Sequence, residues 1–487
     1  MRKPSQFLTH LFSVYSANAV NGVLGIVAVP LVVGLLGDEK YGIYSIYPLL
    51  ASYVALIDCG VTKHFIRLMS SAPGADEKAD YLRKALGWYL LLAFLLFGSL
   101  PLSVYLISRH LFPVPLEYHL QVRWIVVLSA VEYILGIPLM VAQAYTMANL
   151  GFGRYSQFTV ISGLLRYVLM FFAAWMYHNP AMVVVFLVAR RFPELICARF
   201  VLLMPPGKAW RPRISFREFL EVLKSSSVMS LAQFLQTTVV SIGTLLLNRH
   251  FGIAVLGHYR AAFDLSSKVW FFSNGLGLVV FPKFSQMLAD VEERKKLVRK
   301  MMLWLEKSLI GYLCLAIMAI AAAPGFLPLI HLGHEQIVRF FMLLILGVCL
   351  NAHTNIAYEY MLADNRYGTV AILSASLLIV MVASYLVLMN SSGPDAIAWA
   401  WIISQGIYVL AADELVVRGK DDSMVRHWKQ PAVKLVMILV AAGFVAMGIR
   451  SAVLTMAMTA PFLLLLGYWM IVKDWQELRW MLPKKNG

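Results

Sequence analysis

The sequence has few charged residues and few cysteines. Charged side chains make up only 14% of the residues, whereas hydrophobic ones make up 60%, so too little polar surface remains to cover a water-soluble fold. The cysteines lie in apolar segments at wide, unrelated spacings, which argues against a disulfide framework or a zinc site: Cys59, Cys197, Cys314 and Cys349. The composition therefore predicts that the bilayer is the solvent of this chain.

The sequence also lacks a large hydrophilic loop and the motifs of common catalytic sites. It has no P-loop, no H-E-x-x-H and no G-x-S-x-G motif. A membrane-embedded glycosyltransferase or polymerase would need a sizeable loop with acidic or metal-binding groups, and none is present. The net charge of +16 is not accompanied by basic patches interleaved with aromatic residues, so we expect no nucleic-acid partner. We predict that the chain is not an enzyme.

Apolar runs of about 20 residues, the length that crosses a bilayer as a helix, recur along nearly the whole chain. They predict an all-α polytopic membrane protein with about 14 transmembrane helices. The first run continues far beyond the length of a signal peptide, so we expect it to be retained. The predicted helices are 12–36, 41–69, 86–107, 124–147, 158–177, 181–204, 228–247, 253–284, 305–323, 338–361, 370–389, 397–417, 433–449 and 452–472.

The basic residues are distributed unevenly between alternate loops. If the N-terminus is inside, the inner segments hold about 22 Lys and Arg residues and the outer ones about four. Because basic loops resist translocation, this asymmetry predicts that both termini are cytoplasmic.

A glycine and tyrosine motif occurs twice, with the spacing G-x4-G-x-Y. The first copy starts at Gly37 and ends at Tyr44, and the second starts at Gly252 and ends at Tyr259. Each copy falls between the first two helices of a set of six, so we predict two parallel six-helix repeats followed by two C-terminal helices. The predicted divisions are an N-terminal bundle (1–207), a cytoplasmic linker (208–217), a C-terminal bundle (218–420) and a final pair of helices with a cytoplasmic tail (421–487).

The first two helices resemble a known family. Their pattern, Pro30, Leu36-Gly37, Tyr41-Gly42, Tyr44, Asp58-Cys59-Gly60 and Arg67, is similar to the start of polysaccharide-export proteins of the Wzx flippase type, within the multidrug/oligosaccharidyl-lipid/polysaccharide (MOP) exporter superfamily. The resemblance implies translocation of a polyprenyl-pyrophosphate-linked oligosaccharide across the bacterial cytoplasmic (inner) membrane for surface polysaccharide such as O-antigen of lipopolysaccharide, capsule or exopolysaccharide. It also implies membrane lipids, a polysaccharide polymerase and chain-length machinery as partners.

Charged residues inside the predicted helices mark the candidate site, because a charge near the bilayer centre is costly and usually faces the bundle interior. Cations would bind a pyrophosphate, and buried carboxylates would couple transport to a proton or sodium ion. No other cofactor and no metal is expected. The candidates for substrate binding are Lys63, Arg67, Arg166, Arg191, Arg260 and Lys268, and those for ion coupling are Asp58, Glu132 and Asp264.

Simpler interpretations remain open for several of these residues. Glu132 is explained equally well by a salt bridge to Arg166 or Arg67. Arg190 and Arg191 are expected to point in different directions on one helix, so that at most one faces a cavity. His353 is expected to be an ordinary histidine at a helix contact. The alternatives for function are a multidrug or cation antiporter, which would rely on midplane acids, and a lipid II flippase, both of the same superfamily.

Overall fold

The computed structural model describes residues 4–57, 65–66, 68–69, 72, 74–213, 216–271, 273, 291–417 and 429–450. All regular elements in this part of the chain are helical. Eight helices within it are long and apolar enough to cross a membrane. The predicted all-α class is therefore confirmed, while the total of about 14 spans stays a prediction.

The chain forms two compact units. Each unit combines segments from both halves of the sequence, so the units do not coincide with the predicted domains. The N-terminal unit comprises Ser13–Ala261 and Tyr367–Leu378, and the C-terminal unit comprises Met1–Phe12, Ala262–Arg366 and Ile379–Gly487. The domain boundaries predicted from the sequence, at 207, 217 and 420, stay predictions.

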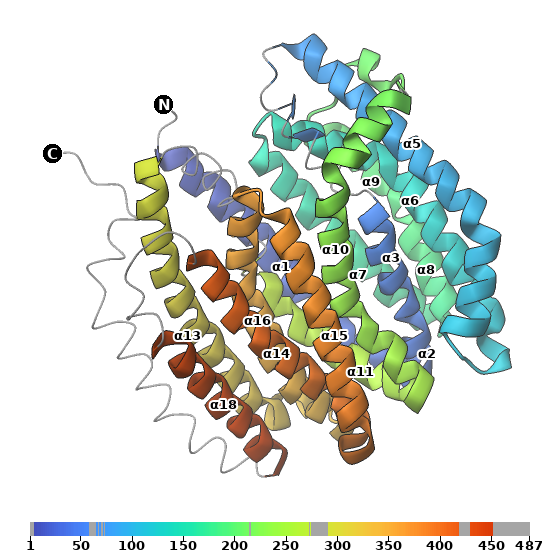
Figure 1. Ribbon diagram of the computed structural model, residues 1–487. Helices are drawn as coiled ribbons and strands as arrows, with labels where there is room; N and C mark the ends of the chain where they lie inside the picture. The colour runs from blue at the N-terminus through green and yellow to red at the C-terminus, as the bar shows by residue number, and fades with distance from the viewer. Residues whose placement is uncertain are drawn as a thin grey trace. The chain divides into compact units, whose positions relative to one another are not determined.

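The described part of the N-terminal unit consists of helices and short helical turns (Figure 1). Its elements are α1 (Pro4–Leu36, from Ser13 onward), α2 (Asp38–Tyr44), α3 (Ile46–Ile57), α5 (Ala75–Leu106), the π-helical turn η1 (Ile107–Leu111), the 3-10 turn η2 (Leu116–Tyr118), α6 (His119–Ala148), α7 (Phe152–Tyr177), α8 (Pro180–Ala189), α9 (Arg191–Val201), the 3-10 turn η3 (Gly207–Trp210), α10 (Phe216–Phe251) and the first part of α11 (Ile253–Ser266).

Helix α6 is the central element of this unit, because it packs against α3, α5, α7, α8 and α9. Its buried residues include small ones, such as Ala130, Gly136 and Ala142, which let neighbouring helices approach closely. Several large side chains of α5 face away from this core and are exposed, among them Phe94 and Leu102. This distribution suits a helix with one face toward protein and the other toward lipid.

The two copies of the glycine motif have the same backbone geometry and contact each other. Gly37 and Gly252 have φ angles of 78° and 84°, a left-handed region that favours glycine. A Cβ added to Gly42 would collide with the carbonyl oxygen of Ile253, and one added to Gly257 would collide with that of Asp38. The repeated glycines are therefore required both for the turns and for the close approach of α2 to α11.

The basic segment after α9 packs against the start of α5. Arg213 lies 3.1 Å from a carboxylate oxygen of Asp80, and the Arg83 Nε donates a hydrogen bond of 3.1 Å to the carbonyl oxygen of Arg211. The backbone N–H of Arg213 donates to the carbonyl of Arg83 at 3.0 Å. Part of the predicted cytoplasmic linker is thus attached to the N-terminal unit by several polar contacts.

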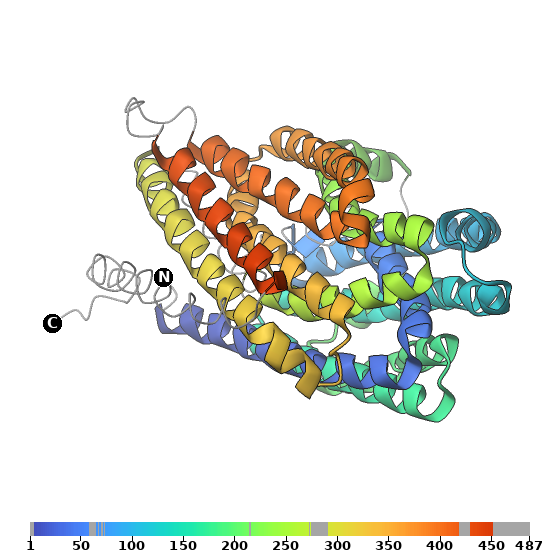
Figure 2. The ribbon, with the colours of Figure 1, turned by 90° about the horizontal axis from the view of Figure 1, so that it is seen from below.

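The C-terminal unit is built around α14 (Glu335–Ala363), which packs against α13 (Val291–Leu329), α16 (Ala396–Val417) and α18 (Lys429–Arg450). These four helices lie side by side in both views (Figures 1 and 2). A Cβ on Gly347 of α14 would collide with the ring of Trp401 on α16, so glycine allows the two helices to approach. The remaining elements are the 3-10 turn η4 (Ser267–Val269), the greater part of α15 (Tyr367–Ser392) and the 3-10 turn η5 (Gly393–Asp395).

Candidate functional site

Three of the sequence-predicted site residues come together in the N-terminal unit. Glu132 lies on α6, Arg166 on α7, and Arg191 at the start of α9. Glu132 pairs with Arg191 and lies within electrostatic reach of Arg166, while the predicted roles of the three residues stay predictions. Asp58, Lys63 and Arg67 lie outside the described residues, so their roles stay predictions.

The other three predicted residues follow one another along α11 and η4. Arg260 is buried and Asp264 is half-buried on α11. The α-helix ends at Ser266, so Lys268 lies in the following 3-10 turn rather than on a continuous helical row. On a continuous α-helix, residues four apart would share one face; the change of helix type at Ser266 interrupts this row before Lys268. Their proposed roles stay predictions.

The sixth predicted span is interrupted at the candidate site. Helix α8 begins after Asn179, whose side-chain oxygen accepts a hydrogen bond of 2.9 Å from the N–H of Ala181. It ends at Ala189, and α9 starts at Arg191. Pro193 supplies the physical reason, since it has no N–H to donate to the carbonyl four residues earlier. The single helix predicted over 181–204 is therefore two helices, with Arg190 at their junction.

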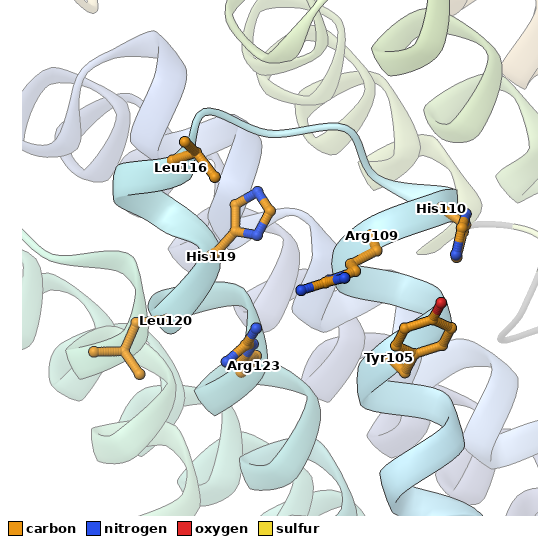
Figure 3. Close-up of a pocket in the computed structure, with 7 residues that line it drawn as sticks. All are labelled: Tyr105, Arg109, His110, Leu116, His119, Leu120 and Arg123. Atoms are coloured by element: carbon orange, nitrogen blue, oxygen red, sulfur yellow. The ribbon is translucent and has the colours of Figure 1, made fainter.

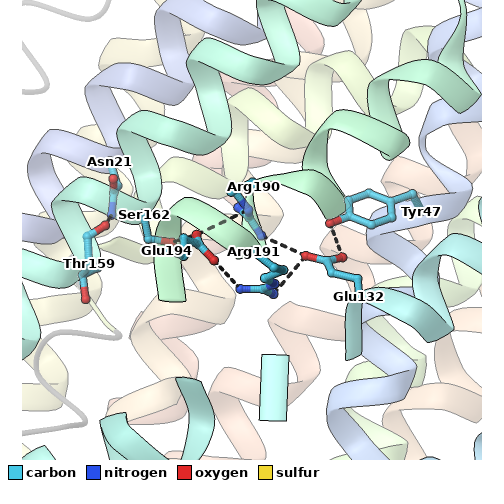
Figure 4. A network of polar contacts seen from close by, with 8 residues as sticks. All are labelled: Asn21, Tyr47, Glu132, Thr159, Ser162, Arg190, Arg191 and Glu194. Carbon is cyan, nitrogen blue, oxygen red and sulfur yellow. Dashed lines mark hydrogen bonds and ion pairs between the residues drawn. The ribbon is translucent and has the colours of Figure 1, made fainter. Parts of the chain in front are cut away.

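This junction lets two consecutive arginines bind the same two carboxylates (Figure 4). Glu132 Oε1 lies 2.9 Å from an Nη2 atom of both Arg190 and Arg191. Glu194 lies 3.4 Å from Arg190 Nε and 2.8 Å from Arg191 Nη1. The two arginines were expected to point in different directions on one helix; in the structure both side chains reach the same two carboxylates. We call Glu132, Arg190, Arg191 and Glu194 the arginine–glutamate network.

Two hydroxyl groups complete the network from neighbouring helices. Tyr47 of α3 donates a hydrogen bond of 2.5 Å to Glu132, and Ser162 of α7 donates one of 2.5 Å to Glu194. The network thus joins α3, α6, α7, α8 and α9. Burial is nearly complete at Glu194, whose side chain is 0% exposed, but that of Arg191 is 23% exposed. Arg191 is therefore the more accessible of the paired arginines.

Arg166 adds a third cation beside the network. It lies within electrostatic reach of Tyr44, Tyr47 and Glu132, and its guanidinium carbon is 5.8 Å from the ring centroid of Tyr167. Among the described residues, no carboxylate lies within ion-pair distance of Arg166, and its Nε has no hydrogen-bond partner. Three arginines and two glutamates leave one net positive charge, which makes this region suited to an anionic ligand.

Among the described residues, Glu132 pairs with Arg190 and Arg191 and not with Arg166, whereas Arg67, the other expected partner, lies outside them. Glu132 is 58 positions from Arg190 in the sequence, so spacing along one helix could not reveal their contact. Glu194 had a recognisable signal, since it is an acid within a predicted span. Tyr47 and Ser162 had no recognisable signal in the sequence, because tyrosine and serine are common in predicted membrane spans.

A second buried polar cluster lies in the C-terminal unit. His353 of α14 contacts Ser308 of α13 through Nδ1 at 2.8 Å and Asp413 of α16 through Nε2 at 3.2 Å. Lys434 of α18 lies 2.5 Å from the same Asp413 oxygen. His353 is therefore part of a charged cluster on four helices rather than an isolated contact histidine. Asp413 and Lys434 were missed because their partners are far away in the sequence.

No group of three or more His, Cys, Asp or Glu side chains that could hold a metal ion occurs in the described part of the chain. The arginine–glutamate network has two basic groups around two acids, with Arg166 beside it, and this set suits ion pairing and anion binding rather than coordination of a cation.

The family and fold follow from comparisons with known proteins. The model of a family described as "Polysaccharide biosynthesis protein" matches residues 31–331. No curated protein matches the chain by sequence.

Several solved membrane transporters have the same fold. A lipid II flippase, MurJ, in an inward closed conformation has a TM-score of 0.63 at 13% sequence identity. The match covers 94% of this chain and 99% of the MurJ chain. A MATE multidrug transporter, DinF-BH, has a TM-score of 0.64 at 14% identity, covering 86% and 96%. A variant of the Vibrio cholerae MATE transporter VcmN has a TM-score of 0.59 at 14% identity, covering 85% and 95%. The chain is therefore a multi-pass membrane protein that belongs to the polysaccharide biosynthesis protein family, with the fold of the MOP exporter superfamily.

Proposed function

We propose that this chain is a flippase that moves a polyprenyl-pyrophosphate-linked oligosaccharide across the bacterial cytoplasmic membrane for surface polysaccharide synthesis. It is not an enzyme in this proposal, and both termini are cytoplasmic. The observation that carries the proposal is the surplus positive charge at Arg166 beside the arginine–glutamate network. A pyrophosphate would supply the partner that Arg166 does not find among the carboxylates of the described residues. Membership in the polysaccharide biosynthesis family supports a glycan-bearing substrate.

The proposed mechanism is alternating access. The anionic head group binds beside the cationic side chains of the N-terminal unit while the polyprenyl tail remains in lipid, and access to the site then changes from one side of the membrane to the other. Binding of the substrate adds negative charge next to Arg166 and Arg191. Because Arg191 already binds Glu132 and Glu194, a phosphate would compete with these carboxylates for its N–H groups. A proton on Glu132 would remove one of the two carboxylates that compete with the phosphate for Arg191, and this is the proposed coupling to protons; sodium is the alternative coupling ion.

The test compares two arginines of the same helix in a strain that depends on this protein for its surface polysaccharide. Arg166→Gln removes the half-buried cation beside the network, whereas Arg154→Gln removes an exposed one three turns earlier on α7. We expect the first variant to lose surface polysaccharide at normal membrane abundance and the second to retain it. Arg166→Lys, which keeps the charge but not the planar fork, should be intermediate.

Normal polysaccharide from Arg166→Gln would refute the site. The closest rivals are a multidrug or cation antiporter and a lipid II flippase, because structures with these descriptions share the fold. An antiporter for cations is disfavoured by three arginines in one cluster, since like charges repel. A changed drug sensitivity with normal glycan export would instead support it.

A further inference from the structure

A cavity of about 600 Å³ lies at the hairpin between α5 and α6, away from the arginine–glutamate network. We call it the hairpin pocket. Four of its lining residues are basic: Arg109, His110, His119 and Arg123. The others are Tyr105, Leu116 and Leu120, and no carboxylate is among the lining residues. The pocket therefore combines positive charge with apolar side chains and lacks an internal counter-charge.

A π-helical turn forms one wall of the pocket. The N–H of Phe112 donates to the carbonyl of Ile107 at 3.1 Å, which closes the wider turn, and the buried ring of Phe112 anchors its end. The turn carries Arg109, which extends toward His119 across the gap between the two helix ends (Figure 3). Single π turns inside α-helices are frequent at functional sites. The irregular backbone thus presents a cation to the pocket.

The basic side chains are oriented by groups other than acids. The Arg109 guanidinium lies 5.8 Å from the ring centroid of Tyr105, and the Nε2 of His119 contacts the carbonyl oxygen of Val114 at 3.1 Å. Among the described residues, neither Arg109 nor Arg123 has a carboxylate within ion-pair distance, in contrast to Arg190 and Arg191. Their N–H donors are available to a ligand.

The nearest acids belong to a separate contact. Tyr118 donates a hydrogen bond of 3.4 Å to Glu39 and also interacts with Glu117. Neither acid lines the pocket.

Exposed apolar side chains surround the basic ones at the ends of two candidate spans, Ala75–Leu111 and Leu116–Ala148. Leu116 is 87% exposed and Leu120 is 64% exposed, and Leu102, Leu111 and Trp124 are also exposed. Exposed leucines at the end of a span contact lipid tails, and tryptophan is typical of the interface. A ligand that satisfies both parts of this surface has an anionic head and an apolar tail.

We propose that the hairpin pocket binds the phosphate of an anionic phospholipid. Arg109 and Arg123 donate to the phosphate oxygens, while the acyl chains lie along Leu116 and Leu120. Arginine suits this role because its planar fork matches phosphate geometry. Acyl chains can pack against the exposed leucines, whereas inorganic phosphate cannot. The site should therefore bind a lipid phosphate more tightly than free phosphate. This lipid site is independent of the substrate site at Arg166.

The test is native mass spectrometry of the full chain in detergent containing phosphatidylglycerol or phosphatidylcholine. Wild-type protein should retain phosphatidylglycerol in preference to phosphatidylcholine. The double variant Arg109→Gln/Arg123→Gln should retain at least about tenfold less phosphatidylglycerol, the factor expected for losing one or more charge-assisted hydrogen bonds. The double variant with lysine at both positions keeps the charge and should bind more than the glutamine variant.

The matched control is Arg249→Gln, an exposed arginine in the last turn of α10, which should leave lipid retention unchanged. A monodisperse elution profile shows that each variant is folded. Equal retention by the glutamine double variant, or equal retention of the two lipids by wild-type protein, would overturn the proposal. Displacement of the lipid by equimolar inorganic phosphate would also overturn it, because the site would then recognise a free anion.

Discussion

Glu194→Gln tests whether the arginine–glutamate network holds the N-terminal unit together. The Glu194 side chain is fully buried and contacts Arg190 at 3.4 Å, Arg191 at 2.8 Å and Ser162 at 2.5 Å. Glutamine keeps nearly the same shape and still accepts a hydrogen bond from Ser162. It removes the negative charge and leaves both arginines with Glu132 as their remaining carboxylate. The substitution therefore isolates the electrostatic contribution.

The expected loss is large because breaking a buried ion pair strands a charge. Removing one partner of such a pair costs about 3–5 kcal/mol, which is a large fraction of the roughly 5–15 kcal/mol that stabilises a typical folded protein. We use the lower end of this range, since Arg191 is 23% exposed and Glu132 still neutralises part of the charge. A loss of about 3 kcal/mol corresponds to a lower melting temperature by several degrees.

The assay is thermal unfolding of the purified chain in detergent. The quantity measured at each temperature is the fraction of the protein that remains monodisperse after heating. Glu335→Gln is the matched control, because this carboxylate is 87% exposed and lies 3.9 Å from Arg339. A surface ion pair of this kind contributes little to the stability of the folded protein. The control should melt like the wild type. If Glu194→Gln also melts like the wild type, the network does not stabilise the fold and the reasoning is refuted.

Two further predictions concern the glycine repeat and the C-terminal cluster. Gly257→Ala should lower the melting temperature, because the new Cβ meets the backbone carbonyl of Asp38, which cannot rotate away. Gly311→Ala is the control and should leave the melting temperature unchanged, because no atom lies within 4 Å of the added Cβ. Equal melting temperatures for the two variants would contradict the packing argument. Lys434→Met should destabilise the chain by leaving the buried Asp413 short of a counter-charge. Adding Asp413→Asn should restore part of the loss in the same melting assay, and purely additive effects would show that the two residues do not interact.

The helical framework could be predicted because apolar length and loop charge are local properties of a sequence. The first span, 12–36, agrees with the observed candidate span at both ends. The glycine motif was visible for the same reason, since a repeated spacing needs no knowledge of the fold. Its contact could not be predicted: only the structure shows that Gly42 and Gly257 lie against backbone from the opposite copy.

The candidate site was predicted in part. Glu132, Arg166 and Arg191 were recognisable as costly charges within apolar runs. Their arrangement could not be predicted, because Arg190 and Arg191 pair with Glu132 of α6, which is 58 positions from Arg190 in the sequence.

Contacts between distant segments set the limit of the sequence argument. Lys434 lies in the last described helix, which was interpreted as an addition to the two repeats, yet it binds Asp413 beside His353. Spacing along one helix predicts partners three or four residues apart. It carries no information about which helices become neighbours, so clusters of this kind require the structure.

The most direct test of the proposed transport function is deletion of the gene, followed by chemical identification of lipid-linked glycan in the inner leaflet of the cytoplasmic membrane. The proposed flippase predicts that a polyprenyl-pyrophosphate-linked oligosaccharide accumulates there while surface polysaccharide is lost. Expression of the wild-type chain should reverse both effects, and expression of Arg166→Gln should reverse neither. Unchanged surface polysaccharide without any accumulated lipid-linked glycan, together with altered drug sensitivity, would contradict the account.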